Sequence, residues 1–213
     1  MSIGNAIKSV GVRIYEEFFA HDEFDKAHNT ETTRTVHRRR LRVGNSAQSY
    51  FATQPEFFKR ACSYLPEEAK NYRFFDLGSG KGRVLIMAHE HGFQHVAGVE
   101  LSQSLIAICK RNLAKLGITD VEVYAEDASV IQLPDEPLVI FMYNPFKPPI
   151  FNKVVDHLIK HTRPVYLVYV TPMYKRVIQE TGHFTPIVEL PYLAVYKNPA
   201  CPVPNEVCAS IQN

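Results

Sequence analysis

A glycine-rich turn flanked by charged residues is the most specific local feature of the sequence. It reads Asp-Leu-Gly-Ser-Gly-Lys-Gly-Arg over residues 76–83. Glycines at alternate positions let the backbone turn sharply and approach a ligand without obstruction by Cβ atoms. The spacing differs from the G-x-G-x-x-G of dinucleotide-binding folds and from the G-x-x-x-x-G-K-[ST] of a P-loop. The turn therefore predicts either a ligand-binding loop or a tight connection between a strand and a helix.

Three further polar positions favour the ligand-binding interpretation, because each follows a predicted strand. Glu100 ends the second strand, Asp127 follows the third, and Asn144 follows the fourth. The carboxyl ends of parallel strands meet at one edge of a sheet, where open α/β sheets bind their ligands. A carboxylate at the position of Glu100 can accept hydrogen bonds from ribose hydroxyls. We therefore expect these groups and Asp76 to surround one ligand.

The elements that position these residues follow from the hydrophobic pattern beyond Asn71. Short β-rich runs alternate with helical patterns, which is typical of a parallel sheet with crossover helices. The last two strands have no room for a helix between them, so we expect them to pair antiparallel. The pattern indicates five β–α units followed by a hairpin. The predicted strands are 72–77, 95–100, 121–125, 138–143, 164–170, 183–189 and 192–196, and the predicted helices are 82–91, 102–116, 150–161 and 172–181.

The ordered motifs together resemble a known family. DLGSGKGR, GVELS, AEDAS and YNPF are similar to the motifs of class I S-adenosylmethionine-dependent methyltransferases, over residues 72–198. The resemblance implies an α/β fold, a Rossmann-like doubly wound sheet of seven strands. Its implied strand order is 3-2-1-4-5-7-6, with the last strand pair antiparallel. Phe24-Asp25 and residues 49–53 also resemble a lead-in found in a bacterial subgroup with no assigned substrate.

The resemblance implies S-adenosyl-L-methionine as the cofactor and a role for each motif. An acid in the first motif would bind the amino group, the glycine backbone would face the carboxylate end, and later acids would hold ribose and adenine. Tyr50, on a predicted lid, would lie over the cofactor or simply pack at the start of a helix. The implied cofactor-binding residues are Asp76, Gly78, Ser79, Gly80, Gly82, Glu100, Leu101, Asp127, Ala128, Asn144, Tyr50 and Thr53.

The segment Tyr143-Asn144-Pro145-Phe146 is the predicted catalytic element. It resembles the [DN]-P-P-[YF] motif of methyltransferases that act on exocyclic or amide nitrogen, with one proline missing. Asn144 can accept a hydrogen bond from an amine, and Phe146 or Tyr143 can stack on a planar acceptor. A rigid strand exit that closes the cofactor pocket is the alternative interpretation. Methyl transfer needs mainly alignment of the nucleophile with the S–CH₃ bond, so we expect in-line displacement.

Several acceptors remain open at this point. The glycine-turn and G-V-E patterns are similar to those of some protein-lysine methyltransferases, which favours a protein lysine or a small amine. The alternatives are a small-molecule O-methyltransferase, an RNA methyltransferase and a non-catalytic cofactor-binding protein. Five arginines within residues 34–42 could bind phosphate, although a solvated connecting segment is the simpler explanation. Arg83 is expected to pair with an acid.

Composition restricts the class of protein but not its chemistry. The 213 residues suit one domain with a small appendage, and the net charge is only +2. Apolar runs are too short to span a bilayer, and the four cysteines form no C-x-x-C, so we expect a cytoplasmic protein with reduced thiols and no metal. His157 and His161 beside Asp156 are interpreted as surface histidines. The sequence leaves the oligomeric state open.

The chain divides into three predicted parts. Residues 1–70 form an N-terminal helical cap, with helices near 3–20 and 54–64. Residues 71–198 form the cofactor-binding core. Residues 199–213 form a loose tail. Because acceptor pockets in this fold are built by additions to the core, we expect the cap to decide substrate choice.

Overall fold

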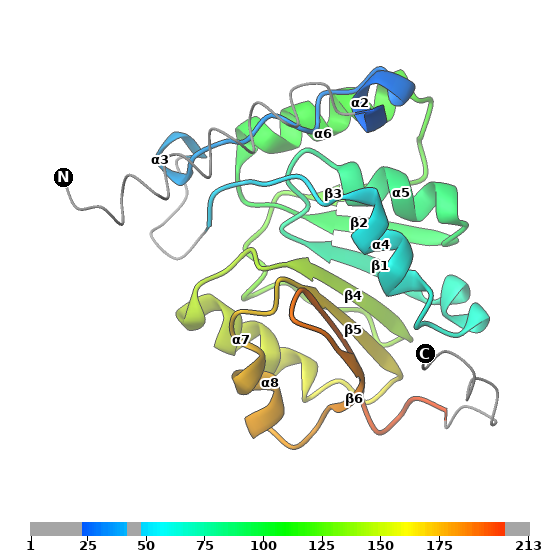
Figure 1. Cartoon of the computed structure of the whole chain (residues 1–213), viewed down its shortest axis with the longest axis vertical. Coiled ribbons are helices and arrows are strands. Elements are labelled where there is room, and N and C mark those ends of the chain that lie inside the picture. The colour runs from blue at the N-terminus through cyan, green and yellow to red at the C-terminus, as the bar shows by residue number, and fades with distance from the viewer. Residues whose placement is uncertain (1–22, 42–47, 203–213) are drawn as a thin grey trace.

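A computed structural model describes residues 23–41 and 48–202 of the chain (Figure 1). The helix predicted near residues 3–20 lies outside the described residues, as do Arg42 and Cys208. No helix among the described residues is long and apolar enough to cross a membrane.

One mixed sheet of seven strands organises the molecule. Its order is β3-β2-β1-β4-β5-β7-β6, and β7 runs antiparallel to both β5 and β6, which confirms the predicted topology. The other neighbouring strands pair in parallel. The strands are β1 (Arg73–Leu77), β2 (His95–Val99), β3 (Glu122–Tyr124), β4 (Leu138–Tyr143), β5 (Val165–Val170), β6 (Thr185–Glu189) and β7 (Leu193–Lys197).

Helices cover both faces of the sheet (Figure 1). Alternate strand residues enter opposite cores: Phe74 joins the core with α4 and α5, and Phe75 joins the core with α7. The period of two along each strand produces this division. The helices are α2 (Glu23–His28), α3 (Arg38–Leu41), α4 (Pro55–Cys62), α5 (Arg83–His91), α6 (Gln103–Lys115), α7 (Pro148–Leu158) and α8 (Lys175–Glu180), with a 3₁₀ turn at Glu67–Asn71.

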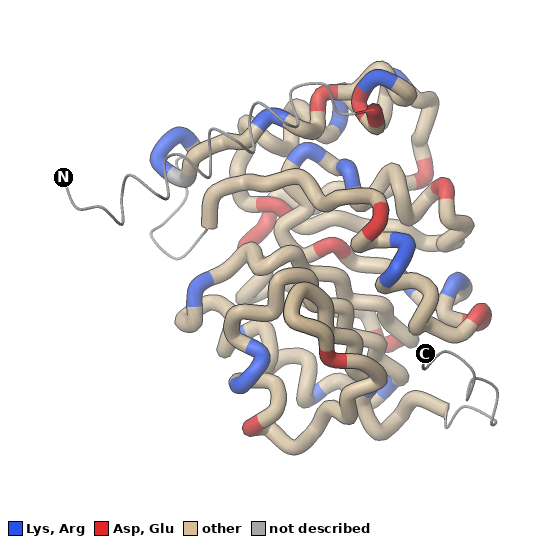
Figure 2. The backbone as a smooth tube through the Cα atoms, viewed as in Figure 1, with Lys and Arg blue, Asp and Glu red and all other residues tan. Residues whose placement is uncertain are grey.

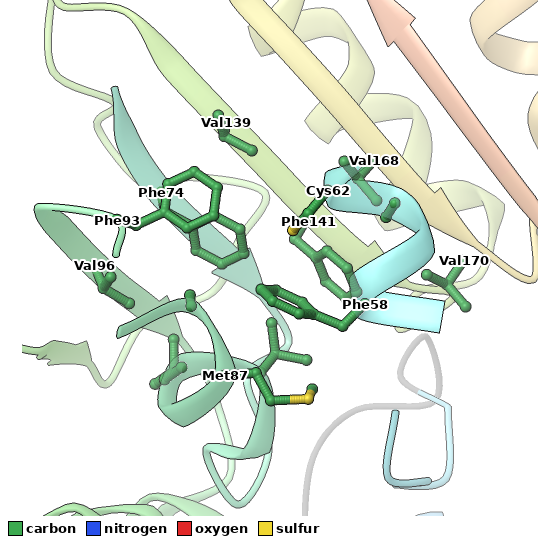
Figure 3. Close-up of a cluster of buried hydrophobic side chains, with 14 of the residues drawn as sticks. Phe58, Cys62, Phe74, Met87, Phe93, Val96, Val139, Phe141, Val168 and Val170 are labelled. Carbon is green, nitrogen blue, oxygen red and sulfur yellow. The ribbon is translucent and has the colours of Figure 1, made fainter. Parts of the chain in front are cut away.

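Helix α4 ties the N-terminal part to the sheet. Figure 3 shows Phe58 of α4 beside Phe74 of β1 and Phe141 of β4. The ring centroid of Phe58 lies 6.2 Å from that of Phe74 and 6.0 Å from that of Phe141. All three side chains are almost fully buried, so this helix shares the core of the sheet.

The structure has one β–α unit fewer than the five counted from the sequence, although the four helices placed after Asn71 are all formed, as α5, α6, α7 and α8. No helix follows β3; residues 125–137 connect β3 to β4 through turns. Pro134 and Pro137 each remove an amide donor and restrict the backbone, which disfavours a helix here. Ala128 and Ile131 still bury their side chains in the core.

The start of the predicted loose tail is packed rather than loose. Cys201 is 6% exposed and belongs to the core cluster, and its Sγ lies 3.3 Å from the Val165 carbonyl oxygen. Asn198 Oδ1 accepts a hydrogen bond from the Val165 amide at 2.9 Å. Residues 203–213 lie outside the described residues. Cys62, Cys109 and Cys201 are free thiols.

Candidate functional site

A cavity of about 210 Å³ opens at the carboxyl edge of the parallel strands. Its wall brings together most of the residues singled out from the sequence, drawn from the segments at or after the ends of β1, β2, β3 and β4 and from the N-terminal part. The predicted residues that line it are Tyr50, Thr53, Asp76, Gly78, Ser79, Glu100, Leu101, Asp127, Ala128, Tyr143, Pro145 and Phe146. The lining residues that the sequence analysis missed include Leu41, Gln48, Ser49, Phe51, Glu126 and Ile150.

The glycine turn adopts backbone angles that disfavour other residues. Gly78, Gly80 and Gly82 have φ values of 92°, 55° and 86°. A Cβ on Gly78 would lie 2.6 Å from the Pro145 Cβ, and one on Gly80 would overlap the Tyr50 ring. Gly80 and Gly82 lie outside the cavity lining. These two glycines therefore serve the close packing of the turn.

Asp76 is the most deeply buried acid of the cavity. Its side chain is 3% exposed, and no hydrogen bond to the carboxylate comes from the described residues. Burial raises the pKa of Asp76 well above its ordinary value, and the nearby Glu100 carboxylate raises it further. A cationic ligand would relieve both effects.

Glu100 is held by backbone amides rather than by a cation. Its Oε2 accepts from the Gly80 amide at 3.0 Å, and its Oε1 accepts from the Ser102 amide at 2.8 Å. Burial raises the pKa of Glu100, and the amide hydrogen bonds counteract part of that rise. Each carboxylate oxygen keeps a second lone pair for a ligand hydroxyl.

The segment after β3 forms the far wall of the cavity. Asp127 Oδ1 accepts a hydrogen bond from the Ser129 amide at 2.8 Å, which fixes the turn. Ala128 is buried beside it, whereas Leu101 across the cavity is 46% exposed. An exposed leucine at a cavity rim offers apolar surface to a flat ligand.

The strand exit after β4 differs from the prediction in one respect. Tyr143, Pro145 and Phe146 line the cavity, but Asn144 does not. The Asn144 backbone has a φ of 39°, and its Oδ1 accepts a hydrogen bond from the Tyr169 phenol at 3.0 Å. Its Nδ2 lies 2.9 Å from Met173 Sδ. Tyr169 was missed by the sequence analysis, and a phenol within an otherwise apolar strand was the available signal.

Two cations of the glycine turn hold an N-terminal strap, which we define as residues 29–41. Arg83 is 2% exposed and donates to Thr32 Oγ1 at 2.6 Å and to Thr33 Oγ1 at 2.7 Å. Its guanidinium also lies 3.7 Å from Asp25, as expected of a paired arginine. Lys81 is 1% exposed and bonds to Glu31 and to the Arg34 carbonyl. The strap is therefore fixed to the carboxyl edge of the parallel strands.

Tyr50 links the strap to the cavity. Its phenol donates to the Thr32 carbonyl at 2.6 Å, its backbone pairs with Val36, and its ring covers Gly80. Lys81 Nζ lies 5.5 Å from the centre of the ring. Tyr50 thus packs on the glycine turn and lines the cavity at the same time.

No group of three or more His, Cys, Asp or Glu side chains within residues 23–41 and 48–202 is arranged to hold a metal ion. His161 instead has its Nε2 2.9 Å from the Glu136 carbonyl oxygen, and its partner in the predicted pair, His157, lies on α7 away from the cavity.

Comparison with known proteins identifies the architecture. A family model described as a methyltransferase domain matches residues 68–187. An RNA methyltransferase from Salinibacter ruber, solved with S-adenosyl-L-homocysteine, is 20% identical with a TM-score of 0.52, covering 76% of this chain and 99% of that one. A 16S rRNA N2 G1207 methyltransferase from T. thermophilus, solved with S-adenosylmethionine and guanosine, is 16% identical with a TM-score of 0.54, covering 70% of this chain and 43% of that one.

A putative RNA methyltransferase from Pyrococcus horikoshii is 18% identical with a TM-score of 0.52, covering 67% of this chain and 78% of that one. At these identities the likeness establishes a shared fold. No curated protein matches this sequence.

Proposed function

This chain belongs to the methyltransferase-domain family and is an S-adenosylmethionine-dependent enzyme, and from that premise we propose that it methylates a nitrogen nucleophile by in-line displacement. The observation that carries the proposal is the cavity at the carboxyl edge of the sheet, where the buried carboxylate of Asp76 and the partly buried carboxylate of Glu100 face no neutralising cation from the described residues.

The cavity chemistry fits the cofactor. S-adenosylmethionine carries an ammonium and a sulfonium, and when bound it supplies an activated methyl group. In the proposal, Asp76 accepts hydrogen bonds from the ammonium, since its carboxylate lacks a partner among the described residues. Glu100 uses its free lone pairs for the ribose hydroxyls. Leu101 packs on the adenine, and Asp127 accepts from the adenine amino group.

The acceptor is proposed to approach from the end of β4. Tyr143 and Phe146 line that side of the cavity and can stack on a planar group. Asn144 adjoins the lining residues without lining the cavity itself; its Oδ1 retains one lone pair beside the Tyr169 hydrogen bond, and the acceptor amine is proposed to reach this lone pair. Desolvation and alignment of the nucleophile by these groups would carry most of the rate enhancement.

The finer assignments from the sequence are part of this proposal. A protein lysine or a small amine as the source of the nitrogen stays a prediction, as do the cytoplasmic location and the division into cap and core. An O-methyltransferase and a non-catalytic cofactor-binding protein remain the competing activities.

Calorimetry with S-adenosylmethionine and transfer of a radiolabelled methyl group to fractionated lysate test the proposal together. We expect the wild type and Asp156→Asn, which removes an exposed carboxylate on α7, to bind the cofactor equally. We expect Asp76→Asn to lose about 10–100-fold in affinity, the value of one hydrogen bond to a charged group. Absence of binding by the wild type would overturn the cofactor site, and binding without any labelled product would favour the non-catalytic alternative.

A further inference from the structure

The strap carries several arginines that follow its one acid, Glu31, along the chain. Between Glu31 and Glu56 there is no Asp or Glu at all, while Arg34, Arg39 and Arg40 lie in the strap and are exposed. None of these three guanidinium groups forms an ion pair with the described residues. In Figure 2 the short helix α3 stands out as a block of basic residues.

Glu31 of the strap and Asp25, which bonds to it, are both already paired. Glu31 is paired with Lys81 at 3.1 Å and with Arg111 at 3.6 Å. Asp25 accepts from Thr32 and Thr33 and lies 3.7 Å from the buried Arg83. Some exposed cations elsewhere do pair with acids, as Arg163 does with Asp135. The strap arginines therefore present positive charge that no acid within residues 23–41 and 48–202 pairs with.

This charge is held at the mouth of the cavity. Leu41, which follows Arg40 directly, lines the cavity, and its carbonyl accepts from the Ser102 hydroxyl at 3.3 Å. The Gln48 amide donates to the Pro145 carbonyl at 3.1 Å on the β4 side. The arginines thus adjoin a residue of the same cavity whose β4 side is lined by Tyr143 and Phe146.

We infer that the strap binds the phosphodiester backbone of single-stranded RNA and delivers a base to the cavity. The inference rests on the proposed function and names RNA, in place of a protein or small amine, as the carrier of the nitrogen. Guanidinium groups match phosphate geometry through paired hydrogen bonds. Tyr143 and Phe146 supply aromatic faces for an unstacked base. Helix α3 has four residues, too few to enter a DNA major groove and read it.

The direct test is the salt dependence of binding. The full-length protein, saturated with S-adenosylhomocysteine, is titrated against fluorescent single-stranded RNA of mixed sequence at several salt concentrations. We expect the logarithm of the association constant to fall linearly with the logarithm of the salt concentration. Arg34→Gln/Arg39→Gln/Arg40→Gln should make the slope shallower by about 2, at about 0.7 for each phosphate that an arginine no longer neutralises.

The matched control is Lys153→Gln/Lys160→Gln/Arg176→Gln, which removes three exposed charges from α7, α8 and the turn after α7. It should leave the slope unchanged. Equal reductions of the slope in the two triple variants, or binding without a salt slope, would overturn the inference. The assignment to RNA would be overturned if single-stranded DNA bound as tightly as RNA. It would also be overturned if polyglutamate displaced the labelled RNA as effectively as unlabelled RNA does.

Cofactor binding separates this inference from the proposed function. The strap variant should bind S-adenosylmethionine as the wild type does, because its arginines lie outside the cavity lining. Intact cofactor binding without RNA binding overturns the inference alone, whereas absent cofactor binding overturns the proposed function. Labelled product from lysate should be destroyed by ribonuclease and should resist protease. The reverse result would identify the acceptor as a protein.

Discussion

The Tyr169 phenol donates a hydrogen bond of 3.0 Å to Asn144 Oδ1 and thereby joins the ends of the two central strands β4 and β5. Burial raises the pKa of Tyr169, so the phenol stays protonated and acts as the donor at neutral pH. Asn144 has a φ of 39°, a conformation that asparagine tolerates better than most residues. The amide is therefore held in one orientation by both its backbone and its neighbour.

Substitution of Asn144 should separate the role of the amide from that of the backbone. Asn144→Gly keeps the positive φ without strain but removes the amide, so we expect a folded protein that binds S-adenosylmethionine and transfers methyl at least tenfold more slowly. Asn144→Ala should lose the same activity and in addition about 1 kcal/mol of stability, because alanine is strained at this φ. Label transfer to the acceptor fraction and thermal unfolding measure the two effects.

Tyr169→Phe tests the positioning role on the same acceptor fraction. The ring still stacks on Phe151 at 5.1 Å, so the core is retained and cofactor affinity should not change. The rate of transfer should fall with little change in the acceptor concentration needed for half-saturation. Wild-type rates in both Asn144→Gly and Tyr169→Phe would mean that this pair only holds the two strand ends together and takes no part in methyl transfer.

Asp76 should lower the stability of the ligand-free protein and strengthen its binding of the cofactor. Its folded pKa is raised, so folding favours the protonated form, and stability falls as the pH rises from the unfolded value near 3.9 through the folded pKa. Asp76→Asn should be more stable than the wild type at pH 7 by about 1–3 kcal/mol, and the difference should vanish below pH ~4. Urea unfolding at pH 7 and pH 3.5 measures it.

The same titration predicts how cofactor binding depends on pH. A cationic ligand binds the ionised carboxylate, so affinity for S-adenosylmethionine should increase as the pH rises towards the raised pKa, with a proton released on binding. Calorimetry in buffers of different ionisation enthalpy detects that proton. Affinity that does not vary with pH in the wild type, or that varies equally in Asp76→Asn, would contradict the role of this carboxylate.

The sequence predicted the strands that carry the site better than the positions of individual side chains around it. Residues 138–143 form a strand as predicted, because a continuous apolar run bounded by prolines fits only a buried central strand. Lys81 had no local signal: a lysine in a glycine turn is usually exposed, and its burial depends on Glu31, fifty residues away. The direction of the Asn144 side chain likewise follows from its positive φ and from Tyr169, which no pattern within the motif encodes.

Gly80 and Tyr50 should be coupled. Alanine at position 80 has both an unfavourable positive φ, at about 1–2 kcal/mol, and a Cβ that overlaps the Tyr50 ring. We expect Gly80→Ala to weaken cofactor binding and to destabilise the protein by more than the φ strain alone. Adding Tyr50→Ala should restore part of the stability, and a double-mutant cycle by thermal unfolding measures the coupling. Strictly additive effects would mean that the ring moves aside freely.

The attachment of the strap should depend on the charge of Asp25. Burial by itself would raise the pKa of Asp25, but hydrogen bonds from Thr32 and Thr33 lower it below its ordinary value. A carboxyl with a lowered folded pKa contributes stability above the unfolded value near 3.9, and this contribution is lost as the pH falls through the folded pKa. Asp25→Asn should therefore cost about 1–3 kcal/mol at pH 7 and progressively less below pH ~4.

The behaviour of Asp25→Asn is the opposite of that expected for Asp76→Asn, so the two variants control for each other in one pH series. Asp25→Asn should also speed limited proteolysis of the strap, since Arg83 then holds two threonines without the acid beside them. Arg83→Leu should share this phenotype and add little in the double variant, because both residues act through the same contact. A strap cut at the wild-type rate in both variants would place its anchorage in Lys81 and Glu31 instead.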